Sequence, residues 1–99
     1  MITTTRFTLG EVVATPDALQ ALAGNGQTLA EFLHRHGQGD WGCVCDEDKR
    51  LNDDAIAHEG DPDQQRRVLS VYFTTDKTKL YVISESDRSV TTLLLASEY

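Results

Sequence analysis

Ninety-nine residues carry 16 Asp and Glu against 9 Lys and Arg, a net charge of −7, and 39% of them are hydrophobic. This balance predicts one globular domain spanning residues 1–99, with too little chain for separate cofactor and substrate domains and no apolar run that would cross a membrane. The acidic charge disfavours direct binding of DNA or RNA, whose phosphates it repels, and favours a partner protein with a basic surface.

The first residues, MITTTRFTLGEVV, contain no basic segment followed by an uninterrupted apolar run. We therefore expect no signal peptide and a cytoplasmic location. Two cysteines, Cys43 and Cys45, are one residue apart, and a reducing compartment would keep them as thiols.

Two short helices are expected next. Thr15 is a good N-cap for a helix over 16–23, and Gly24 supplies its stop. A second helix follows in QTLAEFLHRHG, where Thr28 and Glu31 have the spacing of a capping box. The two helices are expected to pack as a hairpin.

A third and more exposed helix is expected from Asp46 to His58. Its acidic first turn suits the helix dipole, and Leu51 and Ala55 are expected to share the buried stripe. The helical half then covers about residues 15–58, and EGDPDQQ, residues 59–65, is expected to form a loop.

The remaining residues, about 66–96, are typical of β-strands. RRVLSVYFT, KLYVISES and VTTLLLAS are rich in Val, Leu, Ile, Tyr and Thr, and polar turns separate them. The prediction is an α+β fold, with two to three short N-terminal helices packed on a three- to four-stranded antiparallel sheet. One sheet face should meet the helices, and RFTLGEVVA or a partner should partly cover the other.

The negative charge is concentrated in one segment. Eight acidic residues lie between positions 46 and 63, against Lys49 and Arg50. This segment is the candidate contact for a basic partner, and the alternative is a solvated helix face. The candidate contact residues are Asp46, Glu47, Asp48, Asp53, Asp54 and Glu59.

The stretch RHGQGDWGCVC contains residue types that bind metals. On a helix, however, His34 and His36 diverge by about 200°, so they do not ligate one ion from a regular turn. Cys43 and Cys45 lack the C-x-x-C spacing of zinc knuckles, and we expect them on opposite sides of an extended segment. The sequence therefore predicts no metal site and no cofactor.

A structural role explains the same stretch better. Gly39 and Gly42 allow positive φ, Asp40 can bond within its own turn, and Trp41 can anchor the turn to the sheet. Gly39, Asp40, Trp41 and Gly42 are thus expected to form an elbow. In DRSVTT, Arg88 is expected to stabilise a turn by pairing with Asp87 or Asp40.

A catalytic alternative uses four polar residues from these two regions. His36 as an acid or base, with Arg88 holding a developing anion, is physically reasonable if the elbow and the last hairpin converge. Asp40 and Ser89 would complete such a site.

Five stretches along nearly the whole chain carry a family resemblance: FTLGEVVATPDALQAL, QTLAEFLHRHGQGDWG, EDKRLN, RRVLSVY and ISESDRSVTTLLLASEY. The chain resembles a family of small proteins of plasmids and integrative elements, often labelled "plasmid-related protein" or "type I restriction endonuclease subunit M". The similarity is specific in DWG and in DRSVTT. The chain departs from the pattern at Cys43 and Cys45, in DPDQQ, and at Lys77, where the pattern usually has glycine.

The resemblance implies a genetic setting rather than a reaction. Mobile elements commonly encode small acidic proteins that block host restriction or CRISPR complexes. The first hypothesis is therefore a non-enzymatic, protein-binding accessory protein of a mobile element, with anti-restriction or anti-CRISPR activity as its most specific form. The alternatives are a small hydrolase or nuclease-like toxin using His36, Asp40 and Arg88, and a structural plasmid factor that forms a homodimer through its open sheet face.

Overall fold

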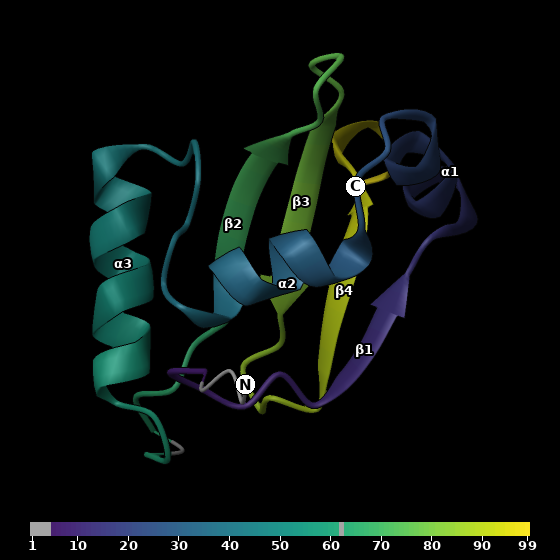
Figure 1. Cartoon of the computed structure of the whole chain (residues 1–99). Helices are drawn as coiled ribbons and strands as arrows, with labels where there is room; N and C mark the ends of the chain where they lie inside the picture. The colour runs from purple at the N-terminus through teal and green to yellow at the C-terminus, as the bar shows by residue number, and fades with distance from the viewer. Residues whose placement is uncertain (1–4, 62) are drawn as a thin grey trace.

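The computed structural model describes residues 5–61 and 63–99, and it has an α+β fold. Figure 1 shows α2 lying across one face of the sheet, α3 alongside β2, and α1 near the end of β4. The elements in chain order are β1 (Glu11–Ala14), α1 (Pro16–Gly24), α2 (Leu29–Gly37), α3 (Asp46–Ala57), β2 (Val68–Phe73), β3 (Lys79–Ser84), β4 (Val90–Leu95) and a 3-10 turn over Ala96–Glu98.

Local capping explains where the first two helices begin. The Thr15 side chain accepts a hydrogen bond from the Ala18 amide at 3.2 Å, and Thr28 accepts one from the Glu31 amide at 3.3 Å. These bonds satisfy backbone N–H groups that a helix start leaves without partners. The expected starts of both helices are confirmed.

The sheet has the strand order β1-β4-β3-β2 (Figure 1). The antiparallel meander of β2, β3 and β4 is confirmed, but the fourth strand, β1, pairs parallel with β4 rather than antiparallel. Gly10 permits this pairing, because its φ is +67° and a Cβ there would collide with the backbone of Arg88 and Ser89. The sheet is therefore mixed.

The buried stripe of α3 differs from the expected one. Ala55 is buried as predicted, but Leu51 is 45% exposed and Asn52 is buried in its place. The Asn52 side chain donates to the Leu69 carbonyl at 2.7 Å and accepts from the Leu69 amide at 3.2 Å. Burying this amide satisfies both backbone groups of Leu69 at the edge of β2, a pairing that an apolar side chain cannot make.

Two apolar clusters hold the helices to the sheet. One lies between α1, α2 and the sheet, and its buried members are Ala18, Leu22, Phe32, Tyr72, Leu80, Val82 and Leu93. The other lies on the α3 side, and its buried members are Phe7, Trp41, Val44, Ala55, Val68 and Val71.

The sheet face opposite α2 retains exposed apolar side chains. Phe73 is 43% exposed and Val13 is 39% exposed, and the ring of Tyr99 stands edge-on against Tyr81 at 5.4 Å. The opening segment RFTLGEVVA does not lie over this face as expected. Its Phe7 packs against His36 and Trp41 on the helix side, and its last residues become the edge strand β1.

Candidate functional site

The elbow after α2 is built from two glycines and two polar contacts. Gly39 and Gly42 have φ values of +83° and +72°. The Asp40 carboxylate accepts from the Arg35 Nε at 2.8 Å and from the Gly42 amide at 3.1 Å. The bond from Arg35 is the largest cause of a lowered Asp40 pKa. The Asp40 carboxylate therefore stabilises the turn of the elbow, and it pairs with Arg35 rather than with Arg88.

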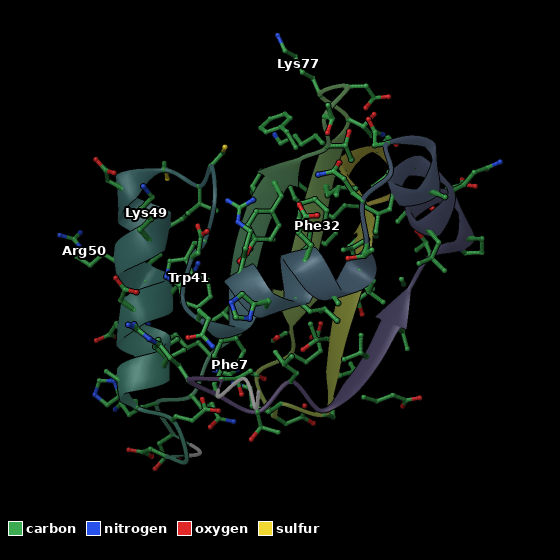
Figure 2. All side chains as sticks on the ribbon, viewed as in Figure 1. Phe7, Phe32, Trp41, Lys49, Arg50 and Lys77 are labelled. Atoms are coloured by element: carbon green, nitrogen blue, oxygen red, sulfur yellow. The ribbon has the colours of Figure 1, made fainter. Side chains whose placement is uncertain are left out.

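Trp41 anchors the elbow to α3 and the sheet. Its side chain is 3% exposed, and its indole Nε1 donates to the Asp53 carboxylate at 2.9 Å. Beside it, Gly42 forms a parallel bridge with Val71, where a Cβ would collide with the Val71 carbonyl. Figure 2 shows Trp41 between α3 and the sheet. The elbow thus extends the β2 edge and supports α3.

His36 lies inside the protein, in a chain of hydroxyl groups. It is fully buried; its Nδ1 is 2.6 Å from the Ser70 hydroxyl and its Nε2 is 3.0 Å from the Ser84 hydroxyl. Ser84 is 2.6 Å from the Thr91 hydroxyl, which donates to the Leu9 carbonyl at 2.7 Å.

This chain determines the proton positions. Because Thr91 gives its proton to the Leu9 carbonyl, it must accept from Ser84. Ser84 then accepts from His36 Nε2–H, which leaves Nδ1 to accept from Ser70. In this arrangement a neutral His36 gives each of the four polar side chains a partner.

The surroundings of His36 disfavour its protonation. Burial first, and then the positive charge of Arg88, lower the pKa of His36 from 6.5 to about 3. Phe7 and Trp41 pack edge-on against the imidazole at centroid distances of 5.3 and 5.6 Å. His36 is therefore a structural neutral histidine, whereas His34, two residues earlier, is exposed.

Arg88 joins three segments of the chain, and its acidic partner is Glu59. Its Nε donates to Glu59 at 3.0 Å, and its Nη1 donates to the carbonyls of Arg66 and Glu85 at 2.7 and 2.8 Å. The side chain of Arg88 is 5% exposed. The expected pairing with Asp87 or Asp40 was wrong, because the guanidinium turns inward beneath the loop that follows α3. Arg88 has φ +58°.

The four residues of the catalytic alternative do not form one site. His36 and Arg88 are inside the protein, whereas Asp40 and Ser89 are exposed. Asp40 is occupied by Arg35, and the Ser89 amide donates to the Asp87 carboxylate at 3.0 Å. A buried imidazole with a pKa of about 3 is a poor proton acceptor near neutral pH, so this arrangement does not favour acid–base catalysis.

The six acidic contact candidates divide into two groups. Asp53 holds the Trp41 indole, Glu59 pairs with Arg88, and Asp48 is half-buried. The exposed carboxylates left for a partner are Asp46, Glu47 and Asp54. Asp54 lies 3.8 Å from the exposed His58 imidazole.

These exposed acids lie on the outer side of α3. Glu47, Leu51 and Asp54 follow the i, i+4, i+7 spacing that places side chains on one helical face. Asp46, Glu47 and Arg50 line an open depression of about 590 Å³ at the start of the helix. Figure 2 shows Arg50 pointing away from the sheet. The surface therefore combines carboxylates with one exposed leucine.

The two cysteines precede this helix. Both are exposed, and Val44 between them is buried. The expectation that they point to opposite sides was wrong, because residues i and i+2 of an extended segment lie on the same side. The Cys43 amide donates to the Val71 carbonyl at 2.7 Å, and Cys45 is the N-cap of α3.

Sequence reasoning missed the partners of the buried polar groups. Ser70, Ser84 and Asn52 were given no role, and Glu59 was not assigned to Arg88. A signal for the serines was present, because each lies among apolar residues at an inward-facing position of a strand, in RVLSVYF and LYVIS.

Across residues 5–61 and 63–99, each helix is too short or too polar to span a bilayer. In the same two segments, His, Cys, Asp and Glu side chains do not gather in threes as a metal centre would require. Comparisons of the chain with models of protein families, with curated proteins and with solved structures found no match.

Proposed function

We propose that this chain is a non-enzymatic protein-binding module whose contact surface is the outer side of α3. We call this surface, formed by Asp46, Glu47, Arg50, Leu51 and Asp54, the outer face of α3. The partner is a protein with a basic surface. The observation that carries the proposal is that Asp46, Glu47 and Asp54 are exposed, while Asp53 and Glu59 are held by Trp41 and Arg88.

The composition of this face suits a binding role. Leu51 is 45% exposed in the middle of the face, between Glu47 and Asp54. An apolar centre with a polar rim is the usual anatomy of a protein interface. Carboxylates at the rim attract a basic partner and set its orientation more than they add affinity. Lys49 and Arg50 offset part of the negative charge of α3. We therefore expect the apolar side chain of Leu51 to contribute to binding beside the carboxylates.

The family resemblance suggests the kind of partner. A small acidic protein of a mobile element would bind a nucleic-acid-handling complex of the host, such as a restriction or CRISPR component, at a surface that normally holds DNA. Carboxylates of α3 would then occupy positions of DNA phosphates. This more specific form of the proposal depends on the resemblance and not on the geometry of the helix.

The test is a tagged pull-down from host lysate with the carboxylates of the outer face removed by Asp46→Asn, Glu47→Gln and Asp54→Asn. We expect the wild-type chain to retain a stoichiometric partner, and this variant to lose it. The same salt increase that weakens the wild-type complex should have little further effect on the variant, because the screened charges are gone.

The matched control removes the same number of charges elsewhere, by Glu11→Gln, Asp17→Asn and Glu31→Gln, all at exposed positions. This control should retain the partner. Loss of binding in both variants would mean that net charge, and not α3, governs the capture. Retention in both would refute a contact at the outer face of α3.

A further inference from the structure

We propose that a second copy of this chain covers the sheet face opposite α2, so that two copies form a symmetric dimer. We call this surface the open sheet face. Its apolar side chains include Val13 of β1, Leu69 and Phe73 of β2, Tyr81 and Ile83 of β3, and Leu94 of β4. The dimer does not depend on the proposed contact at the outer face of α3, and it leaves that face of each copy open to a partner.

Contacts on the helix side show which strand residues point to the open sheet face. The hydroxyls of Ser70 and Ser84 lie within hydrogen-bond distance of His36 on α2. Because side chains alternate along a strand, Leu69 and Ile83 beside them point away from α2. A sheet face in water usually carries polar residues at such positions, so this sheet is unusual in being apolar on both faces.

Aromatic side chains on this face remain partly in solvent. The ring of Tyr99 stands edge-on against Tyr81 at a centroid distance of 5.4 Å, and its hydroxyl accepts from the Arg67 Nη1 at 2.7 Å. Tyr99 is nevertheless 69% exposed, and Phe73 at the β2 edge is 43% exposed. Aromatic residues of this kind are enriched at the centre of protein interfaces.

Charge favours a second copy as the occupant. Among the strand residues and those directly flanking them, the charged side chains on this face are Glu11, Arg67, Lys79 and Glu85, two of each sign. The net charge of −7 therefore lies on the other surfaces, which repel the same surfaces of another copy. Two copies can meet at the open sheet face without net repulsion, whereas a strongly basic partner finds no excess of carboxylates there.

The positions of these charges match under a two-fold rotation. β1 and β2 form the opposite edges of the sheet (Figure 1). Glu11 pairs with Val90 at the β1 edge, the Glu85 amide donates to the Val90 carbonyl at 3.0 Å, and Glu85 lies 3.5 Å from Arg67 at the β2 edge. Glu11 and Arg67 therefore lie in one row across the sheet, at opposite edges.

A two-fold axis that runs along the strands between β4 and β3 lays the β1 edge of one copy over the β2 edge of the other. Glu11 of one copy then meets Arg67 of the second copy, and the reverse pair forms on the other side of the axis. A guanidinium has five N–H donors, so Arg67 can bind this carboxylate while it keeps Tyr99 and Glu85.

The neighbouring row supplies the apolar part of the contact. Val13 pairs with Thr92, Thr92 with Ile83, and Ile83 with Leu69, so these four residues cross the sheet side by side. The same rotation places Val13 of one copy over Leu69 of the second copy. The arrangement therefore joins apolar with apolar side chains and an acid with a base.

The size of the open sheet face sets the expected affinity. Four strands about 4.8 Å apart, with six residues of about 3.3 Å each, give a face of roughly 19 by 20 Å. Its projected area of roughly 400 Å² is below the ~800 Å² per partner of a standard interface. The dimer is therefore weak, with a Kd on the order of 100 μM.

Sedimentation equilibrium of the full chain, up to roughly 1 mM, measures the dimer. Phe73→Ser should raise the Kd about 10-fold or more, because it removes an aromatic side chain that the second copy covers. The matched control Leu51→Ser removes an apolar side chain of nearly equal exposure, 45% against 43%, from the outer face of α3. This control should dimerise as the wild type does. Thermal unfolding shows whether each variant is folded.

An exchange of charges tests the arrangement of the two copies and does not depend on apolar substitutions. At low salt, Glu11→Arg should raise the Kd about 10-fold, because it places an arginine opposite Arg67. Glu11→Arg combined with Arg67→Glu should return the Kd to within about threefold of the wild-type value. Glu31→Arg makes the same change of charge at an exposed position of α2, and it should not weaken the dimer.

A chain that stays monomeric at roughly 1 mM would overturn the proposal. So would a dimer that Phe73→Ser leaves unchanged, or one that Leu51→Ser weakens as strongly as Phe73→Ser does. If the combined exchange at positions 11 and 67 fails to restore the dimer, the two copies do not meet in this arrangement. Pull-down through the outer face of α3 would be unaffected by these results, so the two proposals stand or fail separately.

Discussion

Polar groups in the interior of the protein and on the outer face of α3 differ in burial and in hydrogen bonding. In the interior, His36 of α2 and Arg88 of the turn before β4 are buried, and each is held by named hydrogen-bond partners. On α3, the exposed carboxylates of Asp46 and Glu47 form no such internal network. A buried polar group has a large effect on stability, because the loss of its partner leaves a desolvated group without a hydrogen bond. An exposed carboxylate stays solvated with or without a hydrogen-bond partner in the protein. Polar side chains thus serve stability in the interior, whereas those on the outer face of α3 remain available for binding.

The largest effect on stability is expected at Arg88. Arg88→Met should lower the free energy of unfolding by about 3–5 kcal/mol, because it leaves Glu59 without its cation and two carbonyls without their donor. Urea unfolding at pH 7 measures the loss. The control Arg67→Met removes an arginine that is half-exposed and 3.5 Å from Glu85, and it should cost less than about 1 kcal/mol. Equal losses would contradict the distinction between buried and exposed charges.

The second effect is a pH dependence that depends on His36. Its folded pKa of about 3 lies below its unfolded value of 6.5, so between these values the unfolded state binds the extra proton. The stability from neutral His36 is fully present above pH 6.5 and is lost as the pH falls toward 3. The wild-type chain should lose about 2 kcal/mol between pH 7 and pH 5.

His36→Gln should remove most of this slope, since glutamine does not titrate. His34→Gln, on the exposed side of the same helix, should retain it. Urea unfolding of the three proteins at pH 7 and pH 5 makes the comparison. If the free energy of unfolding of His36→Gln falls between pH 7 and pH 5 as much as that of the wild type, other groups cause the pH dependence. The buried neutral His36 would then not explain it.

The smallest effect on stability is expected on α3. Glu47→Gln together with Asp54→Asn should change the free energy of unfolding by no more than about 0.5 kcal/mol, because both carboxylates are exposed. Thermal unfolding measures this. A loss above about 2 kcal/mol would show that these residues support the fold, and it would remove the basis for reading this face as a surface kept for a partner.

Local signals predicted most of the secondary structure. Thr15 and Thr28 cap helices at the expected positions, and the three strands of the meander follow from their apolar composition. β1 was missed because it is only four residues long and pairs with β4 about 80 residues later. A parallel edge strand of this length has neither a hairpin turn nor a long hydrophobic alternation by which the sequence could predict it.

The candidate sites were less predictable, because they depend on what each side chain meets in space. His34 and His36 differ in exposure although they share a helix and lie two residues apart. The pairing of Arg88 with Glu59 crosses 29 residues, and it replaced the pairing with Asp87 or Asp40 that the sequence suggested. Sequence proximity is a poor guide once a guanidinium is buried and must find several acceptors at once.

The sequence by itself determined the α+β class, the helix starts, the meander and the acidic charge, because propensity, capping and composition act within a few residues. Only the tertiary structure decided that His36 is neutral and buried, that Glu59 is paired with Arg88 while Glu47 stays exposed, and that Cys43 and Cys45 are both exposed. Burial sets these outcomes, and burial depends on contacts between segments that lie far apart in the chain.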